Sequence, residues 1–211
     1  MKKLQIALDE FSLKEGLMLC EKVRAYIDII EIGTPFIIRE GMHAVKAFRE
    51  KFPEKEILAD AKIMDAGKME AGICFEAGAD YVTVLGVTDL GTIKGCVEAA
   101  KEHGKKIVVD MICVENIEKR VAELEAVGIR DIAVHTGVDM QAAGRSPLDD
   151  LKQIKKCSKQ SLISVAGGIK ESTVDIYIEA GADIVIVGGG ISHAEDPEAA
   201  ARKIAEKVHI S

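Results

Sequence analysis

Paired cysteines are missing from this sequence. Its five cysteines are an odd number, and no two of them have the Cys-x-x-Cys spacing. This pattern is typical of reduced thiols and argues against a disulfide framework or a zinc site. We therefore expect most of them to be small buried hydrophobic residues. They are Cys20, Cys74, Cys96, Cys113 and Cys157.

Long apolar runs are also missing. No stretch approaches the roughly 20 apolar residues that a membrane-spanning helix needs. The apolar residues 4–8 follow a basic start, but Asp9 and Glu10 end them too early for the core of a signal peptide. We expect a cytoplasmic protein that has no membrane partner.

Positive charge is in deficit. Lys and Arg number 28 against 35 Asp and Glu, which gives a formal net charge of −7. Nucleic acids and anionic membranes require clustered basic residues, so neither is an expected partner. A small anion such as a phosphate ester stays possible, because backbone N–H groups can bind it on an acidic protein.

Short apolar runs alternate regularly with amphipathic helical patterns. The predicted strands are residues 4–8, 27–32, 57–59, 81–85, 107–109, 132–134, 162–166 and 184–187. The predicted helices include residues 12–25, 41–51, 89–103, 115–127 and 197–208, with further helix starts expected at Ser172 and Pro197. Eight βα units without a linker predict one domain, residues 1–211, folded as a single (β/α)8 TIM barrel. A doubly wound open sheet is the second choice.

Polar residues lie at the ends of most of the predicted strands. They are Asp9, Glu31, Asp60 with Lys62, Asp110 and His135. In such barrels the carboxyl ends of the strands carry the chemistry. Buried carboxylates that converge there repel one another unless a cation lies between them, and Lys62 or a metal ion could be that cation. Glu31 and Asp60 are candidate ligands for Mg²⁺, which proteins hold with one or two carboxylates.

Glycines follow the last two predicted strands. Gly167 and Gly168 end the seventh, and Gly188, Gly189 and Gly190 end the eighth. Loops at these positions of a barrel commonly hold a phosphate, and glycine lets the backbone approach it. We predict a phosphate-bearing ligand, with tight turns as the alternative interpretation.

The pattern Asp60-x-Lys62-x-x-Asp65 follows the third strand. With the barrel and the glycine loops, it resembles the orotidine-monophosphate-decarboxylase superfamily, and within it the 3-hexulose-6-phosphate synthase family. The resemblance covers the whole chain. It rests on residues 5–9, 31–35, 58–67, 135–144 and 165–169.

That resemblance implies an aldehyde-lyase that condenses formaldehyde with D-ribulose 5-phosphate, reversibly, through an enediolate stabilised by Mg²⁺, with Mn²⁺ a possible substitute. His135 would move the C1 proton, Lys62 would stabilise the enediolate, and Glu31 and Asp60 would bind the metal. Asp65 would reach the partner's site in a homodimer. Asp9, Asp139 and the backbone at Gly167, Gly168, Gly189 and Gly190 would bind substrate, and Asp139 would also orient His135.

Three alternatives remain. The resemblance also extends to 3-keto-L-gulonate-6-phosphate decarboxylase, but that family has basic residues after the histidine and an Arg where this chain has Gly189. Ribulose-phosphate 3-epimerase would need two histidine ligands at the strand ends, and only one strand here ends in histidine. A catalytically silent phosphate-binding barrel ranks lowest, because Lys62, Asp65 and His135 all fit the motif. In purely structural interpretations, His135 is a core residue, Asp139 caps a helix and Asp110 lines the barrel mouth.

Overall fold

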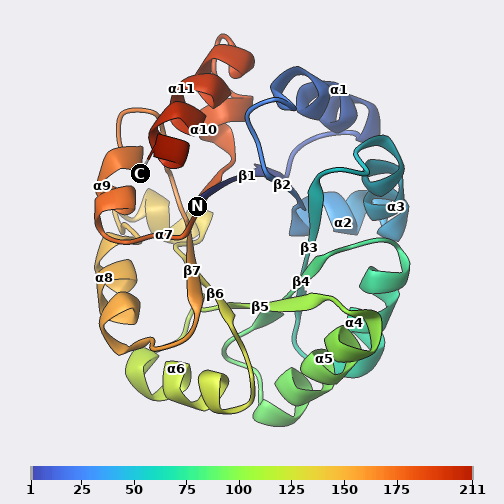
Figure 1. Cartoon of the computed structure of the whole chain (residues 1–211), viewed down its shortest axis with the longest axis vertical. Coiled ribbons are helices and arrows are strands. Elements are labelled where there is room, and N and C mark those ends of the chain that lie inside the picture. Colours follow the sequence, from blue (N-terminus) through green and yellow to red (C-terminus); the bar gives the residue numbers. More distant parts are fainter. Residues whose placement is uncertain (1, 211) are drawn as a thin grey trace.

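The computed structural model describes residues 2–210, apart from the side chain of Val138, so Met1 and Ser211 of the predicted domain lie outside the described residues. Eight parallel strands pair in sequence order, and β1 pairs with β8 to close the barrel (Figure 1). The predicted (β/α)8 barrel is therefore confirmed. The strands are β1 Lys3–Leu8, β2 Ile29–Ile32, β3 Glu56–Ile63, β4 Tyr81–Leu85, β5 Lys106–Asp110, β6 Asp131–His135, β7 Leu162–Ala166 and β8 Ile184–Val187.

Helices surround the barrel on all sides (Figure 1). Those that follow the predicted patterns include α1 Leu13–Val23, α3 Met42–Lys51, α5 Leu90–His103, α6 Ile117–Ala126 and α11 Pro197–Ile210. The other long or medium helices are α4 Gly67–Glu76, α8 Leu148–Cys157 and α9 Val174–Glu179. The predicted start of α9 at Ser172 is wrong, since Thr173 precedes its first helical residue.

Three short helices were not predicted. They are α2 Thr34–Glu40, α7 Val138–Ala142 and α10 Gly189–Ser192, which follow β2, β6 and β8. Only one or two residues separate each of these helices from the strand before it. Its short helical pattern therefore merges with the pattern of that strand in the sequence. All three border the carboxyl ends of the strands, where they shape the mouth of the barrel.

Alternation along each strand divides the apolar residues between two cores. Leu4, Ile6 and Leu8 of β1 face the helices and are fully buried, whereas Gln5 and Ala7 face the lumen. The outer core is the larger one. The inner core contains Ile29, Leu58, Tyr81, Val108, Ala133, Ile184 and Ile186. Because both faces of every strand are covered, the strands are nearly continuous apolar runs in the sequence.

Strand β3 continues past the predicted residue 59, and its register against β4 shifts between Ala59 and Ile63. Within this irregular segment Lys62 has a left-handed backbone with φ +48°. Its N–H donates to Thr83 Oγ1 at 2.9 Å. The irregular segment lies at the carboxyl end of β3, and such bulges are common beside active sites.

The cysteines are free, and three of them, Cys20, Cys74 and Cys96, are buried as expected. Cys157 is half-buried. Cys113 is exposed, and the expectation of burial, which was made for most of the five cysteines, is confirmed by the three buried ones. Within residues 2–210 no helix is long and apolar enough to cross a membrane.

Glu125, near the end of α6, anchors the loop that leads into β7. Its Oε1 accepts hydrogen bonds from Ser158 Oγ, Lys159 N, Gln160 N and Ser161 Oγ at 2.9–3.0 Å. Burial opposes ionisation of this carboxyl, but the four donors lower its pKa to about 2. The charged carboxylate therefore stabilises the folded state.

Glu125→Gln is expected to lower the free energy of unfolding at pH 7 by about 1 kcal/mol, a small value because the group is partly exposed to water. The folded pKa of about 2 lies below the unfolded value of about 4.3, so the contribution is complete above the unfolded pKa. It is lost as the pH falls toward the folded pKa. Urea unfolding at neutral and acidic pH measures the difference, with Glu50→Gln on the exposed side of α3 as the control. An equal loss at both pH values would contradict the assignment.

Candidate functional site

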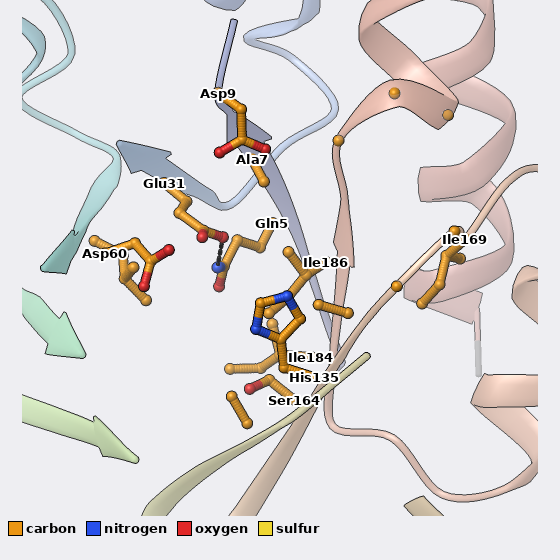
Figure 2. A pocket seen from close by; sticks show the side chains of 18 of the residues that line it. Gln5, Ala7, Asp9, Glu31, Asp60, His135, Ser164, Ile169, Ile184 and Ile186 are labelled. Atoms are coloured by element: carbon orange, nitrogen blue, oxygen red, sulfur yellow. Dashed lines mark hydrogen bonds between the residues drawn. The ribbon is translucent and has the colours of Figure 1, made fainter. Parts of the chain in front are cut away.

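A cavity of about 1380 Å³ opens at the carboxyl ends of the strands. The polar residues predicted at the strand ends line it, and so do the glycines after β7 and β8. Figure 2 shows Asp9, Glu31 and Asp60 on one side, with His135 reaching in from β6. The lining includes Asp9, Glu31, Asp60, Lys62, Asp110, Asp139, His135, Gly167, Gly168, Gly189 and Gly190.

Lys62 joins two buried carboxylates across the mouth. Its Nζ lies 2.8 Å from Asp60 Oδ2 and 3.0 Å from Asp110 Oδ2. Asp60 is 6% exposed and Asp110 only 3%. Carboxylates buried so deeply need a cation nearby, and the ammonium of Lys62 provides it. The side chains from β3 and β5 are thus held in one charged cluster.

The cluster continues to His135, whose Nδ1 lies 2.9 Å from Asp110 Oδ2. Burial opposes ionisation of Asp110, but the hydrogen bond and charge of His135, together with Lys62, lower the pKa of Asp110 to about 2. An ionised Asp110 accepts a hydrogen bond from Nδ1–H, so the neutral imidazole keeps Nε2 as its free acceptor. The arrangement prepares His135 to accept a proton at Nε2.

Lys62 stays protonated in this setting. Burial disfavours its charged form, but the attraction of Asp60 and Asp110 outweighs this effect and raises the pKa of the ammonium above its usual value. A permanently charged ammonium at the mouth can stabilise negative charge that develops on a bound substrate.

Asp60 has donors on both oxygens. Thr83 Oγ1 donates to Oδ1 at 2.7 Å, and Thr34 Oγ1 donates to Oδ2 at 2.8 Å. These threonines come from β4 and the start of α2. Three elements therefore hold one carboxylate in a single orientation.

Glu31 has a different environment. Gln5 Nε2 donates to its Oε2 at 2.5 Å, and Oε1 accepts no hydrogen bond from the described residues. Burial raises the pKa of Glu31 most, and the negative charge of Asp60 raises it further. The neighbouring carboxylates thus repel each other at the edge of an open cavity.

Such a pair fits a divalent cation. Among the described residues no group of three His, Cys, Asp or Glu side chains converges as a metal site. Mg²⁺, however, needs only one or two carboxylates, because water and substrate oxygens complete its shell. The free Oε1 of Glu31 and the mutual repulsion with Asp60 are the features that suit this ion.

The two glycine loops pack backbone against backbone. Gly167 and Gly168 have φ values of +130° and +66°, which favour glycine. A Cβ on Gly190 would lie 2.3 Å from the carbonyl oxygen of Ile169. The absence of side chains lets an anion approach the backbone closely, as phosphate loops require.

Asp9 also depends on a glycine. A Cβ on Gly33 would lie 2.1 Å from Asp9 Oδ1, so only glycine leaves room for this carboxylate beside β2. Asp9 itself is exposed at the mouth, where it can contact a bound ligand.

Two predicted site residues lie apart from the charged cluster. Asp65 is exposed and does not line the cavity; within residues 2–210 its Oδ1 accepts only the N–H of Ala66. Asp139 lines the mouth from the first turn of α7 but is exposed. The carboxylate that hydrogen-bonds His135 is Asp110, so the role expected of Asp139 in orienting His135 belongs to Asp110.

Sequence reasoning missed several residues. Gln5, Thr34 and Thr83 support the carboxylates. For Gln5 and Thr83 only their inward-facing positions on β1 and β4 could have indicated this role, and Thr34 lies at the start of α2, a helix that was not predicted. His193, which no sequence motif singles out, is exposed and lines the cavity mouth, where a Cβ on Gly189 would lie 3.2 Å from its Nδ1.

Comparisons with known proteins agree with the motif. The profile of the orotidine 5'-phosphate decarboxylase / HUMPS family matches residues 2–204. The chain is 48% identical to a 3-hexulose-6-phosphate synthase of Bacillus subtilis (strain 168) over 206 residues, 98% of each protein. It superposes on the crystal structure of 3-hexulose-6-phosphate synthase from Salmonella typhimurium with a TM-score of 0.97, 56% identity and 99% coverage of both chains.

A more distant solved structure is 3-keto-L-gulonate-6-phosphate decarboxylase from Vibrio cholerae. It is similar with a TM-score of 0.88 and 27% identity, covering 100% of this chain and 99% of that one. The synthases are thus more similar in sequence than this decarboxylase, in agreement with the order of the two resemblances drawn from the motifs.

Thr83→Val is expected to lower the free energy of unfolding by about 1–3 kcal/mol, because Asp60 loses a donor and the N–H of Lys62 loses its acceptor. Urea unfolding measures the change. Thr136→Val is the matched control, since Thr136 is also buried but its hydroxyl has no hydrogen-bond partner among the described residues. Equal stability losses in the two variants would show that the Thr83 hydrogen bonds contribute nothing specific.

Proposed function

Because the chain belongs to the orotidine 5'-phosphate decarboxylase / HUMPS family, we propose that it is a lyase that condenses formaldehyde with D-ribulose 5-phosphate to D-arabino-3-hexulose 6-phosphate, reversibly. The observation that carries this proposal is the hydrogen-bonded chain from Asp60 through Lys62 and Asp110 to His135. It places a base and a fixed positive charge in one cavity with two glycine loops suited to phosphate.

Substrate would span the cavity. The backbone at Gly167, Gly168, Gly189 and Gly190 would bind its phosphate, with the sugar extending toward β1, β2 and β3. Asp9 and the exposed Asp139 lie at the mouth, where they would contact hydroxyl groups. The reacting end of the ketose would then lie between Lys62 and His135.

Proton transfer begins the reaction. His135 Nε2 takes a proton from C1 of the ketose, and the electron pair of that C–H bond forms an enediolate. Lys62 donates a hydrogen bond to the developing negative oxygen. C1 then attacks the carbonyl carbon of formaldehyde, a C–C bond forms, and the former carbonyl oxygen takes the proton back from His135.

Glu31 and Asp60 would hold Mg²⁺, or Mn²⁺ in its place. When bound, the ion supplies Lewis-acid stabilisation of negative charge on the sugar oxygens. The support within the protein is the repelling pair of carboxylates and the free Oε1 of Glu31. Thr34 and Thr83 keep Asp60 in the orientation that the site requires.

A homodimer would complete the site. Asp65 is exposed outside its own cavity, and three apolar residues close to it in the sequence, Met64 and the α4 residues Met69 and Ile73, are 53%, 64% and 49% exposed. Large apolar side chains gathered at an exposed site are typical of protein interfaces. We propose that a second copy covers them and that Asp65 reaches the partner's cavity. The free cysteines support a cytoplasmic location, where thiols stay reduced.

The purified protein is expected to consume formaldehyde only when ribulose 5-phosphate and Mg²⁺ are both present, and EDTA should stop the reaction. A colorimetric formaldehyde assay and mass spectrometry of the hexulose phosphate measure this. Consumption that persists after EDTA would refute the metal requirement. Absence of consumption, together with CO₂ release from 3-keto-L-gulonate 6-phosphate, would instead identify a decarboxylase.

His135→Asn is expected to slow the exchange of the C1 proton of ribulose 5-phosphate with D₂O by about 10²–10⁴-fold, the usual loss for a general base. Asp110→Asn should also slow exchange and lower kcat more than it changes KM, because an amide can stabilise the wrong imidazole tautomer. Proton NMR follows the exchange without formaldehyde, and His43→Asn on the exposed face of α3 is the control. Unchanged exchange in His135→Asn would assign the base elsewhere.

A further inference from the structure

Gln5 is the one amide side chain in the barrel lumen that contacts a proposed metal ligand in the part of the chain that the structure describes. It is 2% exposed, and its Nε2 donates to Glu31 Oε2 at 2.5 Å. Figure 2 shows this hydrogen bond within the cavity. Neither side chain has another hydrogen-bond partner among the described residues.

Register explains why these two side chains meet. Ala7 of β1 pairs with Glu31 of β2, and Gln5 pairs with Ile29, so Gln5 lies one inward-facing layer beneath Glu31. Gln5 pairs with Ile29 on one side and Ile186 on the other, and both belong to the apolar inner core. Burying an amide in apolar surroundings without a hydrogen bond destabilises the folded state. The hydrogen bond to Glu31 avoids this loss, so we expect it to persist.

This bond makes the two oxygens of Glu31 unequal. A carboxylate accepts hydrogen bonds, so the NH₂ group of Gln5 must be the part that faces it. Oε2 is thereby held toward the barrel interior, and Oε1 is left for the cavity. Asp60 is similarly constrained, because donors contact both of its oxygens. Neither carboxylate is free to turn both oxygens toward one ion.

Divalent ions differ in what they require. Mg²⁺ demands octahedral geometry with short bonds, whereas Ca²⁺ accepts 6–8 oxygens and often takes carboxylates bidentately. Building on the proposed metal site, we infer that Gln5 is a positioning residue that limits Glu31 to one metal-facing oxygen and so makes the site selective for Mg²⁺ or Mn²⁺ over Ca²⁺. It acts on the metal only through Glu31.

Metal binding without substrate tests this inference. Mn²⁺ binding to the full chain is followed by electron paramagnetic resonance, and Mg²⁺ and Ca²⁺ are added as competitors. Gln5→Leu preserves most of the side-chain volume but frees Oε2. It is expected to weaken Mg²⁺ and Mn²⁺ binding by about 10–100-fold, as loss of a ligand-orienting partner does. Ca²⁺ binding should weaken less, so that the preference shifts toward Ca²⁺ by about tenfold or more.

Three further variants make the result decisive. Gln5→Asn keeps the amide, but its side chain is one methylene too short to reach Glu31. This second variant should therefore show the same shift in ion preference toward Ca²⁺ as Gln5→Leu. Ile186→Leu changes an apolar side chain in the same lumen and leaves the Gln5–Glu31 hydrogen bond in place. The ion preference of this variant should equal that of the wild type. Glu31→Gln should lose metal binding, which establishes that the signal reports this site.

Two outcomes would overturn the inference, and they are distinguishable. If Glu31→Gln loses binding but both Gln5 variants keep the wild-type order of ions, the metal site stands and Gln5 has no part in its selectivity. If Glu31→Gln binds Mn²⁺ like the wild type, the proposed site itself is wrong, and the role of Gln5 is wrong with it. Circular dichroism confirms the fold of each variant before titration.

Discussion

Neutralisation of two buried carboxylates by Lys62 is the interaction on which the site depends. Asp60 and Asp110 come from different strands and are almost inaccessible to water, so each would be destabilising alone. One ammonium between them makes their ionised forms compatible with burial. The left-handed backbone of Lys62 and the bulge in β3 accompany this geometry, in keeping with the concentration of backbone strain at functional sites.

The charged cluster also divides the cavity into two functional sides. Asp110 continues from Lys62 to His135, which gives a proton acceptor on the β5–β6 side. Asp60 and Glu31 form the opposite side, where donors from Gln5, Thr34 and Thr83 fix the carboxylate oxygens. Glycines of the β7 and β8 loops lie between these sides around the ring and complete the wall. A sugar phosphate that spans the mouth would meet all three groups at once.

Most of the fold followed from local patterns. The eight strands and the closed barrel were predictable because apolar runs separated by amphipathic helices leave few other arrangements in 211 residues. The predicted helices 12–25 and 89–103 begin with Ser12 and Asp89, and both residues cap their helices by accepting hydrogen bonds from Glu15 N and Thr92 N. The short helices α2, α7 and α10 escaped prediction, since each closely follows a strand and is shorter than two full helical periods.

Sequence alone determined which residues share the barrel mouth, because the position of a residue at the carboxyl end of a parallel strand is a local property. Asp9, Glu31, Asp60, Lys62, Asp110 and His135 were identified in this way, and all line one cavity. Only the tertiary structure decided which side chains pair. Asp110, not Asp139, hydrogen-bonds His135, and Gln5 lies beneath Glu31. Such pairings depend on strand register and on the inward layer that each residue occupies, which are set by contacts between segments far apart in the chain.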